Sequence, residues 1–221
     1  RKTDLSARLG PATSLALLPD LSQLIPRDQV ESIAAAILHT LQSMVPDAQA
    51  TIAGSFRRGK AASGDVDMVM SGTTSNSASF ILCSLVQTLQ RLGRVSHILS
   101  VPRQEDHREV DVAEVVYVAP TALHGSVHRR VDIVFAAPKR YGAAILAWTG
   151  SSLYERDLRR WAQARGFSVR VFLLTCSFHK WVSSICIHSA HLTRLRKSTS
   201  LTCWACHGCH PHYGMPTLSS K

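Results

Sequence analysis

Two short apolar runs that each enclose an aspartate constrain the fold of this 221-residue chain more than any other feature. Residues 66–70 surround Asp67, and residues 131–135 surround Asp132. Short apolar runs are typical of buried strands, where an unpaired charge carries a high free-energy cost. If the two strands are neighbours in one sheet, their acidic side chains meet, and a shared ligand offsets that cost.

The apolar spacing of the rest of the chain predicts helices packed on a sheet. Apolar residues recur at three- and four-residue steps between Pro26 and Pro46, which predicts a helix over about residues 27–45. Pro11 and Pro19 are expected to interrupt the first 25 residues. Other helices are predicted from the N-cap Ser77 to Leu92, over 139–148 and from Ser151, and other strands over 51–53, 95–101 and 111–118. The expected fold class is α/β (α+β), with a mixed or antiparallel sheet flanked by helices.

The spacing of the acids predicts a metal site. Asp65 and Asp67 are two residues apart on a predicted strand, so their side chains lie on one face. Carboxylates that converge repel each other, and a bound divalent cation relieves the repulsion. Ligand sets made only of oxygen favour Mg²⁺ over zinc. With Asp132 on a neighbouring strand, we predict that three carboxylates hold two Mg²⁺ ions, with Mn²⁺ as the alternative.

A glycine-rich turn directly before these acids predicts a phosphate site. Gly54 and Ser55 follow a predicted strand, and the N–H groups of such a turn can face a phosphate. Arg58 offers a planar, permanently charged fork to phosphate oxygens, and Gly64 precedes Asp65. Taken singly, these features have structural explanations: a common turn, a strand end at the surface, or a salt-bridged acid. Their order along the chain favours the functional interpretation.

These motifs resemble those of the X-family DNA polymerases, the group of DNA polymerases beta, lambda and mu and terminal deoxynucleotidyl transferase. The similar segments are G-S-F-R-R-G-x4-G-D-V-D from Gly54, R-V-D-I-V from Arg130, W-T-G-S from Trp148 and E-R-D-L-R-R from Glu155. A further match is L-I-P-R from Leu24, which is similar to the end of the family's fingers. The resemblance covers about residues 10–167 and is strongest to the mu and terminal-transferase branch. It implies the nucleotidyltransferase palm fold.

The resemblance also implies roles for individual residues. Asp132 would lie nearest the primer 3′-OH, and the Gly150–Ser151 peptide is often cis in the family. Ala147, Trp148 and Gly150 would lie against the sugar of the nucleotide. Ala147 replaces a bulky aromatic of other members, which implies weak discrimination against ribonucleotides. The implied catalytic and metal-binding residues are Asp65, Asp67 and Asp132; the nucleotide-binding residues are Gly54, Ser55, Arg58, Gly64, Ala147, Trp148, Gly150 and Arg156; the DNA-binding residues are Arg130 and Arg159.

The activity that the resemblance implies is attack of a primer 3′-OH on the α-phosphorus of a dNTP, with release of pyrophosphate. One metal ion would lower the pKa of the 3′-OH, and the other would neutralise the triphosphate. We expect a monomeric repair polymerase of the nucleus that binds a DNA primer end and a dNTP and works with end-joining proteins. The alternatives are a template-independent terminal transferase, another nucleotidyltransferase such as a poly(A)-polymerase-like enzyme, and a catalytically inactive truncated isoform. No stretch reaches 18 consecutive apolar residues, so no membrane span is expected.

Composition divides the chain near Phe167. The net charge of +10 suits a polyanionic partner, but residues 168–221 contain no acid and five of the six Cys. The expected organisation is 1–50 for the end of the fingers and a linking helix, 51–150 for the palm, 151–167 for the start of the thumb, and 168–221 for an aberrant or disordered tail. The first residue is Arg rather than Met, which indicates a fragment or a processed form.

The tail has two interpretations. Three cysteines at two-residue spacing, with histidines among them, are typical of a zinc site, although a fourth ligand at standard spacing is unclear. The residues concerned are Cys203, Cys206, Cys209, His207, His210 and His212. The alternative is a translated intron or a shifted reading frame that yields a disordered end, and the abrupt loss of acids favours this alternative.

Overall fold

The computed structural model describes residues 5–120, 125–165, 167–170 and 173–176. All of them belong to one compact unit, Arg1–Ser189. The cysteines and histidines of the predicted zinc site lie outside the described residues. Within the described residues, no helix is long and apolar enough to cross a membrane.

A five-stranded mixed sheet forms the centre of the described fold, in agreement with the expected α/β class. Strand β4 pairs in parallel with β7, and the other pairs are antiparallel. The order across the sheet is β2 (Gln49–Ile52), β4 (Val66–Ser71), β7 (Ser126–Ala136), β6 (Val110–Pro120) and β5 (Val95–Ser100). Strand β7 is more than twice as long as the run 131–135 that predicted it, because its pairing with β6 begins at Ser126.

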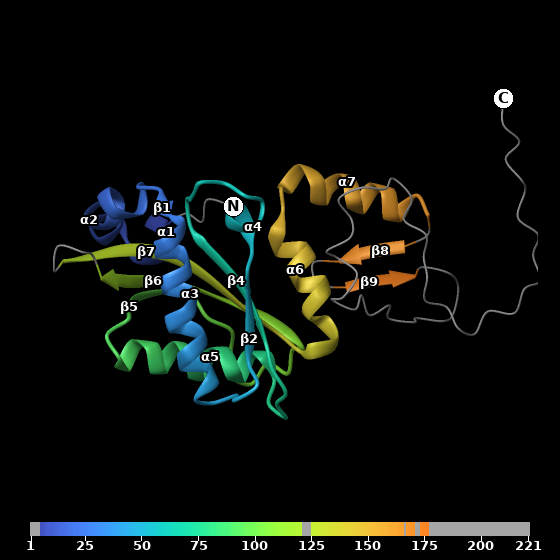
Figure 1. Ribbon diagram of the computed structural model, residues 1–221, viewed down its shortest axis with the longest axis horizontal. Coiled ribbons are helices and arrows are strands. Elements are labelled where there is room, and N and C mark those ends of the chain that lie inside the picture. The colour runs from blue at the N-terminus through green and yellow to red at the C-terminus, as the bar shows by residue number, and fades with distance from the viewer. Residues whose placement is uncertain (1–4, 121–124, 166, 171–172, 177–221) are drawn as a thin grey trace, which may run out of the picture. The chain divides into compact units, whose positions relative to one another are not determined.

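Helices cover both faces of this sheet (Figure 1). Helices α3 (Arg27–Gln42) and α5 (Ala78–Arg91) share the larger hydrophobic core with Met68 and Ile133. Helix α6 (Tyr141–Thr149), which follows the 3-10 turn Pro138–Arg140, packs on Val69 and Val134 in a smaller core on the opposite face. Successive strand residues point to opposite faces, so Asp67 and Asp132 lie on the same face as Val69 and Val134.

One predicted helix end and one predicted break differ from the structure. The helix predicted over residues 27–45 ends at Gln42, because the N–H groups of Met44 and Val45 both donate to the Leu41 carbonyl in a final turn. Pro19 does not break the chain but lies inside α2 (Pro11–Leu21), where its missing N–H removes one helical hydrogen bond, to the carbonyl of the exposed Leu15. A shorter helix, α1 (Leu5–Leu9), precedes it.

Three other sequence predictions are confirmed by hydrogen bonds or dihedral angles. Ser77 caps α5 by accepting a hydrogen bond from Phe80 N, and Ser151 caps α7 (Ser152–Gln163) by accepting one from Tyr154 N. The Gly150–Ser151 peptide is cis. Regular structure continues past the compositional break at Phe167 as a two-stranded antiparallel hairpin. Its strands are β8 (Phe167–Arg170) and β9 (Leu173–Cys176).

Candidate active site

The pairing register of β4 and β7 places two predicted acids side by side. Asp67 is the direct partner of Asp132 in this parallel pair, and Asp65 lies just before β4 begins. One carboxylate oxygen from each of the three residues lies within 4.8 Å of the other two. The sheet therefore brings together the three residues that the sequence predicts as a metal site.

Burial makes this cluster costly in the charged state. Burial raises the pKa of Asp67 to about 7, and the neighbouring Asp132 adds to the shift while Arg58 opposes it. Burial also raises the pKa of Asp132 to about 6, against the opposing charge of Arg130 and with a further contribution from Glu114. A cation that pairs with both carboxylates would remove this penalty.

The donor set fits a divalent cation. Asp132 is 8% exposed, and among the described residues its Oδ1 atom accepts no hydrogen bond. Arg130, a predicted DNA-binding residue, forms a salt bridge with Asp65, and its Nε lies 3.7 Å from Asp132 Oδ1. Three clustered carboxylates, with one buried oxygen lacking a donor, match the oxygen ligands that Mg²⁺ and Mn²⁺ prefer.

The predicted phosphate turn, residues 54–64, packs directly against this cluster. Gly54 begins the short helix α4 (Gly54–Arg57) with a φ of +52°, and a Cβ atom there would lie 1.8 Å from Asp67 Oδ2. The N–H of Ala53 donates to the Asp67 carbonyl at 2.8 Å. Ser55 Oγ donates to Ser63 Oγ at 2.8 Å, which closes the loop that leads to Gly64.

Arg58 connects this turn to the segment predicted to lie beside the nucleotide sugar. Its Nη1 donates to the Thr149 carbonyl at 2.5 Å and lies 3.1 Å from the position of a Cβ atom on Gly150. Trp148 is half-buried against the smaller core, and Ala147 is half-exposed one residue earlier. The structure therefore brings the predicted phosphate-binding and sugar-binding segments into contact.

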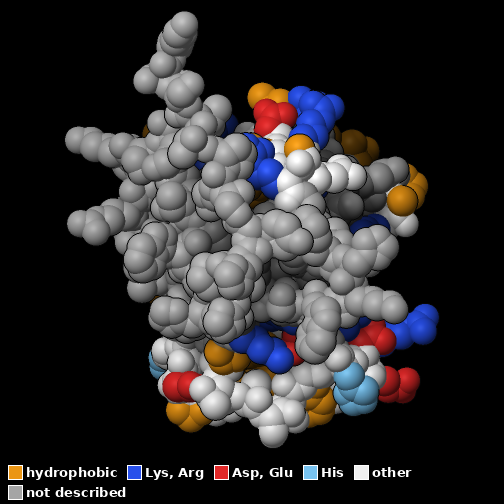
Figure 2. Space-filling view, turned by 90° about the vertical axis from the view of Figure 1, so that its right-hand side faces the viewer, with side chains coloured by type: hydrophobic (Ala, Val, Ile, Leu, Met, Phe, Trp, Pro, Cys, Tyr) orange, Lys and Arg blue, Asp and Glu red, His pale blue; other side chains and the backbone are white. Residues whose placement is uncertain are grey.

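The predicted basic residues of α7 are placed differently. Arg156 is largely exposed, with its Nε 3.9 Å from Asp157, and Arg159 forms a salt bridge with Glu155 at 3.0 Å. Viewed from the side of α7, the upper edge of the molecule carries Lys and Arg side chains beside acidic ones (Figure 2). Among the described residues, neither arginine contacts the three aspartates, so their nucleotide- and DNA-binding roles stay predictions.

One acid near the cluster was not predicted from the sequence. Glu114 on β6 is the direct partner of Asp132 across the antiparallel β6–β7 pair. Its Oε2 lies 3.0 Å from Arg8 Nη1, which also donates to the Leu99 carbonyl at 2.7 Å. Glu114 interrupts a valine-rich strand in the same way as Asp132 does, and that signal could have identified it.

The raised pKa of Asp67 predicts a pH-dependent cost to metal-free stability. The folded pKa of about 7 lies above the ordinary value of 3.8, so stability from this group is complete below pH 4 and is lost as the pH rises through 7. We expect Asp67→Asn to raise the free energy of unfolding of the metal-free protein at pH 8 by roughly 1–3 kcal/mol. At pH 4 the difference should be small. Urea unfolding in chelator at both pH values measures it.

Glu105→Gln, which neutralises an exposed acid, is the control and should change stability little at either pH. Adding Mg²⁺ should stabilise the wild type and leave Asp67→Asn nearly unchanged. If Asp67→Asn is no more stable than the wild type at pH 8 in chelator, the carboxylate cluster carries no charge penalty.

Comparison with known proteins identifies the same region. The protein-family model of the DNA polymerase beta palm matches residues 24–138, which include the three aspartates and the phosphate turn. DNA polymerase lambda of Rattus norvegicus is 28% identical over 166 residues, 75% of this chain. The DNA polymerase type-X family protein pol4 of Schizosaccharomyces pombe is 31% identical over 134 residues, 59% of this chain. DNA nucleotidylexotransferase of Xenopus laevis is 26% identical over 172 residues, 65% of this chain.

The chain spans only part of these relatives. The matched regions cover 28% of the rat protein, 26% of the yeast protein and 33% of the frog protein. The similarity therefore shows the palm family, and the activities of the whole relatives bear on this chain only by inference.

Proposed function

The chain belongs to the family of the DNA polymerase beta palm, the X-family DNA polymerases, and we propose that it transfers a nucleotide from a dNTP to a DNA 3′-OH. The observation that carries this proposal is the register of β4 and β7, which makes Asp67 and Asp132 direct neighbours within reach of Asp65. The reaction joins the 3′ oxygen to the α-phosphorus and releases pyrophosphate.

The chain's own residues divide this task. Asp65, Asp67 and Asp132 would hold divalent ions, which we propose to be two Mg²⁺; such ions lower the pKa of the attacking hydroxyl and neutralise the leaving pyrophosphate. Gly54, Ser55, Arg58 and Gly64 would bind the β- and γ-phosphates. The contact between Arg58 and the Thr149 carbonyl supports this arrangement, because it sets the phosphate turn beside the segment assigned to the sugar.

Primer extension tests the proposal. The full chain is incubated with a labelled primer and dNTPs, with and without a template strand, in Mg²⁺ and then in Mn²⁺. Extension only with template indicates a templated polymerase, and extension of the single strand indicates a terminal transferase. The relatives include proteins named for each activity, so both outcomes are compatible with the family. No extension under any of these conditions would contradict the proposal and favour a catalytically inactive form.

We place the chain in the mu and terminal-transferase branch because of the small residue at position 147. An alanine leaves space near the 2′ carbon of the sugar, so we expect the preference for dNTP over rNTP to stay below about a thousandfold, roughly 4 kcal/mol. Ala147→Tyr should increase that preference about tenfold or more while kcat/KM for dNTP changes less. Steady-state incorporation of both nucleotides measures the ratio. A wild-type preference for dNTP over rNTP above about a thousandfold would contradict the proposed space near the 2′ carbon.

A role in nuclear DNA repair, by end joining or gap filling with end-joining proteins, completes the proposal. It rests on the similarity to DNA polymerase lambda and to pol4, and on the excess of basic over acidic residues, which suits a DNA partner. Recruitment of the tagged chain to laser-induced DNA breaks in nuclei tests it, and an exclusively cytoplasmic distribution would contradict it.

A further inference from the structure

A buried arginine on the catalytic strand lies on the opposite face from the acid cluster. Arg129 is 6% exposed and three residues before Asp132, so their side chains point to opposite faces of β7. Burial lowers the pKa of its guanidinium, and the nearby Asp20 opposes the shift. An arginine stays charged at physiological pH even so, and a buried charge requires specific partners.

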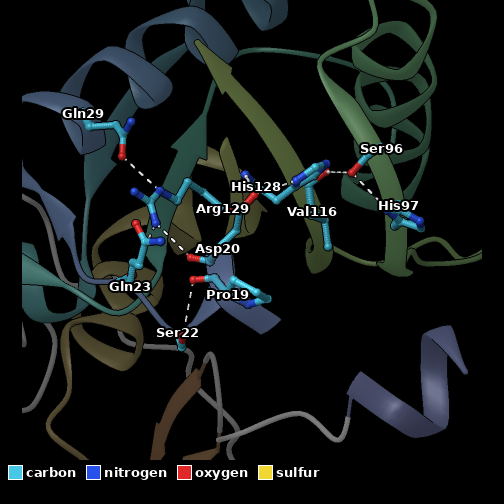
Figure 3. Close-up of polar contacts among 10 residues, drawn as sticks. All are labelled: Pro19, Asp20, Ser22, Gln23, Gln29, Ser96, His97, Val116, His128 and Arg129. Carbon is cyan, nitrogen blue, oxygen red and sulfur yellow. Dashed lines mark hydrogen bonds and ion pairs between the residues drawn. The ribbon is translucent and has the colours of Figure 1, made fainter. Parts of the chain in front are cut away.

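Among the described residues, the hydrogen-bond acceptors of Arg129 all belong to one segment, residues 20–29, which we call the brace. Its Nε donates to Gln29 Oε1 at 3.0 Å, and its Nη1 donates to the carbonyls of Asp20 at 3.0 Å and Gln23 at 3.4 Å. Figure 3 shows the guanidinium lying between Gln29 and Asp20. One side chain therefore fixes both ends of the brace to β7.

Asp20 adds a second attachment to the same strand. Its Oδ2 accepts hydrogen bonds from the backbone N–H of His128 and lies 2.9 Å from His128 Nδ1 (Figure 3). The pairing of β7 with β4 begins only at Val131, so on this edge the Asp20 carboxylate takes the place of a strand partner. The hydrogen bonds to His128 lower the pKa of the Asp20 carboxyl, which keeps it a charged acceptor.

The middle of the brace, residues 25–27, contacts the phosphate turn. Ile25 pairs with Ser63 and Pro26 with Ala62 in the short antiparallel sheet of β1 (Ile25–Pro26) and β3 (Ala62–Ser63). Arg27 Nη1 donates to the carbonyls of Phe56 and Lys60, each at 3.0 Å, and its guanidinium lies 3.6 Å above the Phe56 ring. The brace thus contacts the turn at its start and at its end.

We propose that Arg129 is a positioning residue for the incoming nucleotide: it anchors the brace to β7 and so fixes the phosphate turn relative to Asp132. The inference rests on the proposed function, since the nucleotide is the ligand that the turn would hold. A small displacement of groups that orient a substrate has large effects on binding and rate, even when the altered residue is remote. This role differs from general stabilisation, because the loss of Arg129 should loosen the phosphate turn and leave the rest of the fold in place.

Arg129→Met and Gln29→Met test this role. Met keeps most of the apolar stem of arginine and removes the charge. Gln29→Met removes the side-chain amide whose oxygen accepts from Arg129, and it decides the question if Arg129→Met does not fold. The first measurement is hydrogen exchange of the nucleotide-free proteins. We expect the amides of residues 56–63 to exchange about tenfold faster in the variants, with α5 unchanged. Arg91→Met, at an exposed arginine on α5, is the matched control.

The second measurement is steady-state kinetics. KM for the dNTP should rise about tenfold in the folded variants, while KM for the primer stays the same. A merely structural role would reduce the fraction of active enzyme and leave both KM values unchanged. The inference is overturned if exchange at 56–63 does not increase, or if it increases equally in α5. Absence of activity in the wild type would refute the proposed function. The hydrogen-exchange result would then test by itself whether Arg129 fixes the phosphate turn through the brace.

Discussion

Asp132→Ala is expected to lower the rate of primer extension by about three orders of magnitude or more. Asp132 is the one member of the acid cluster that lies mid-strand, and its register makes it the neighbour of Asp67 on β4 and of Glu114 on β6. Removing its carboxylate leaves two acids where the proposed chemistry needs three. Single-turnover extension in saturating Mg²⁺ and dNTP measures the change.

Glu114→Gln is the matched control for this experiment. Glu114 lies on the same face in direct register with Asp132, but it pairs with Arg8 and is absent from the cluster within 4.8 Å. We expect a change of less than about tenfold, since it acts on the site only through its charge. Burial raises the pKa of Asp132, so removal of its charge should not destabilise the metal-free protein at pH 8. A loss of activity in Asp132→Ala therefore measures the effect on the reaction and not on folding.

Activity of Asp132→Ala within tenfold of the wild type would remove the basis of the proposed mechanism. Loss of activity in Glu114→Gln to the same extent would show that the site depends on its total charge and not on a set of three ligands. The two variants together therefore separate coordination from long-range electrostatics.

The sequence was most informative where one residue contradicts its surroundings. An acid in an apolar run, as at Asp67 and Asp132, marks a strand and a site at once, because burial of a charge needs a compensating partner. Strand alternation then predicts which acids share a face, and the structure confirms that Asp65, Asp67 and Asp132 come together. The mixed α/β fold followed from the same patterns of apolar spacing.

The parts that could not be predicted depend on contacts between distant segments. In the sequence, Arg129 is one of two adjacent arginines, and the residues next to it do not indicate that it is buried against residues 20–29. The salt bridge between Arg8 and Glu114 likewise joins α1 to β6, although more than a hundred residues separate the two in sequence. The end of α3 at Gln42 was missed because the final turn is set by backbone hydrogen bonds that side-chain periodicity does not report.

Gly54→Ala is expected to damage both stability and activity, because the site has no space for a single methyl group. The added Cβ would lie 1.8 Å from Asp67 Oδ2 and 2.7 Å from Asp67 Cγ, on a backbone with a φ of +52°. The turn cannot move away freely, since Ala53 N donates to the Asp67 carbonyl. We expect the free energy of unfolding to fall by about 2–4 kcal/mol and the extension rate to fall about a hundredfold or more.

Gly59→Ala separates the clash from the backbone strain. Gly59 also has a positive φ, of +83°, but a Cβ atom there would meet nothing within 4 Å. This variant should lose only about 1–2 kcal/mol from the left-handed backbone and keep most of its activity. Chemical denaturation and single-turnover extension of both variants measure the two effects. If Gly54→Ala proves no more harmful than Gly59→Ala, the close packing of the phosphate turn on Asp67 is not needed for the site, because the carboxylate can then move aside without loss.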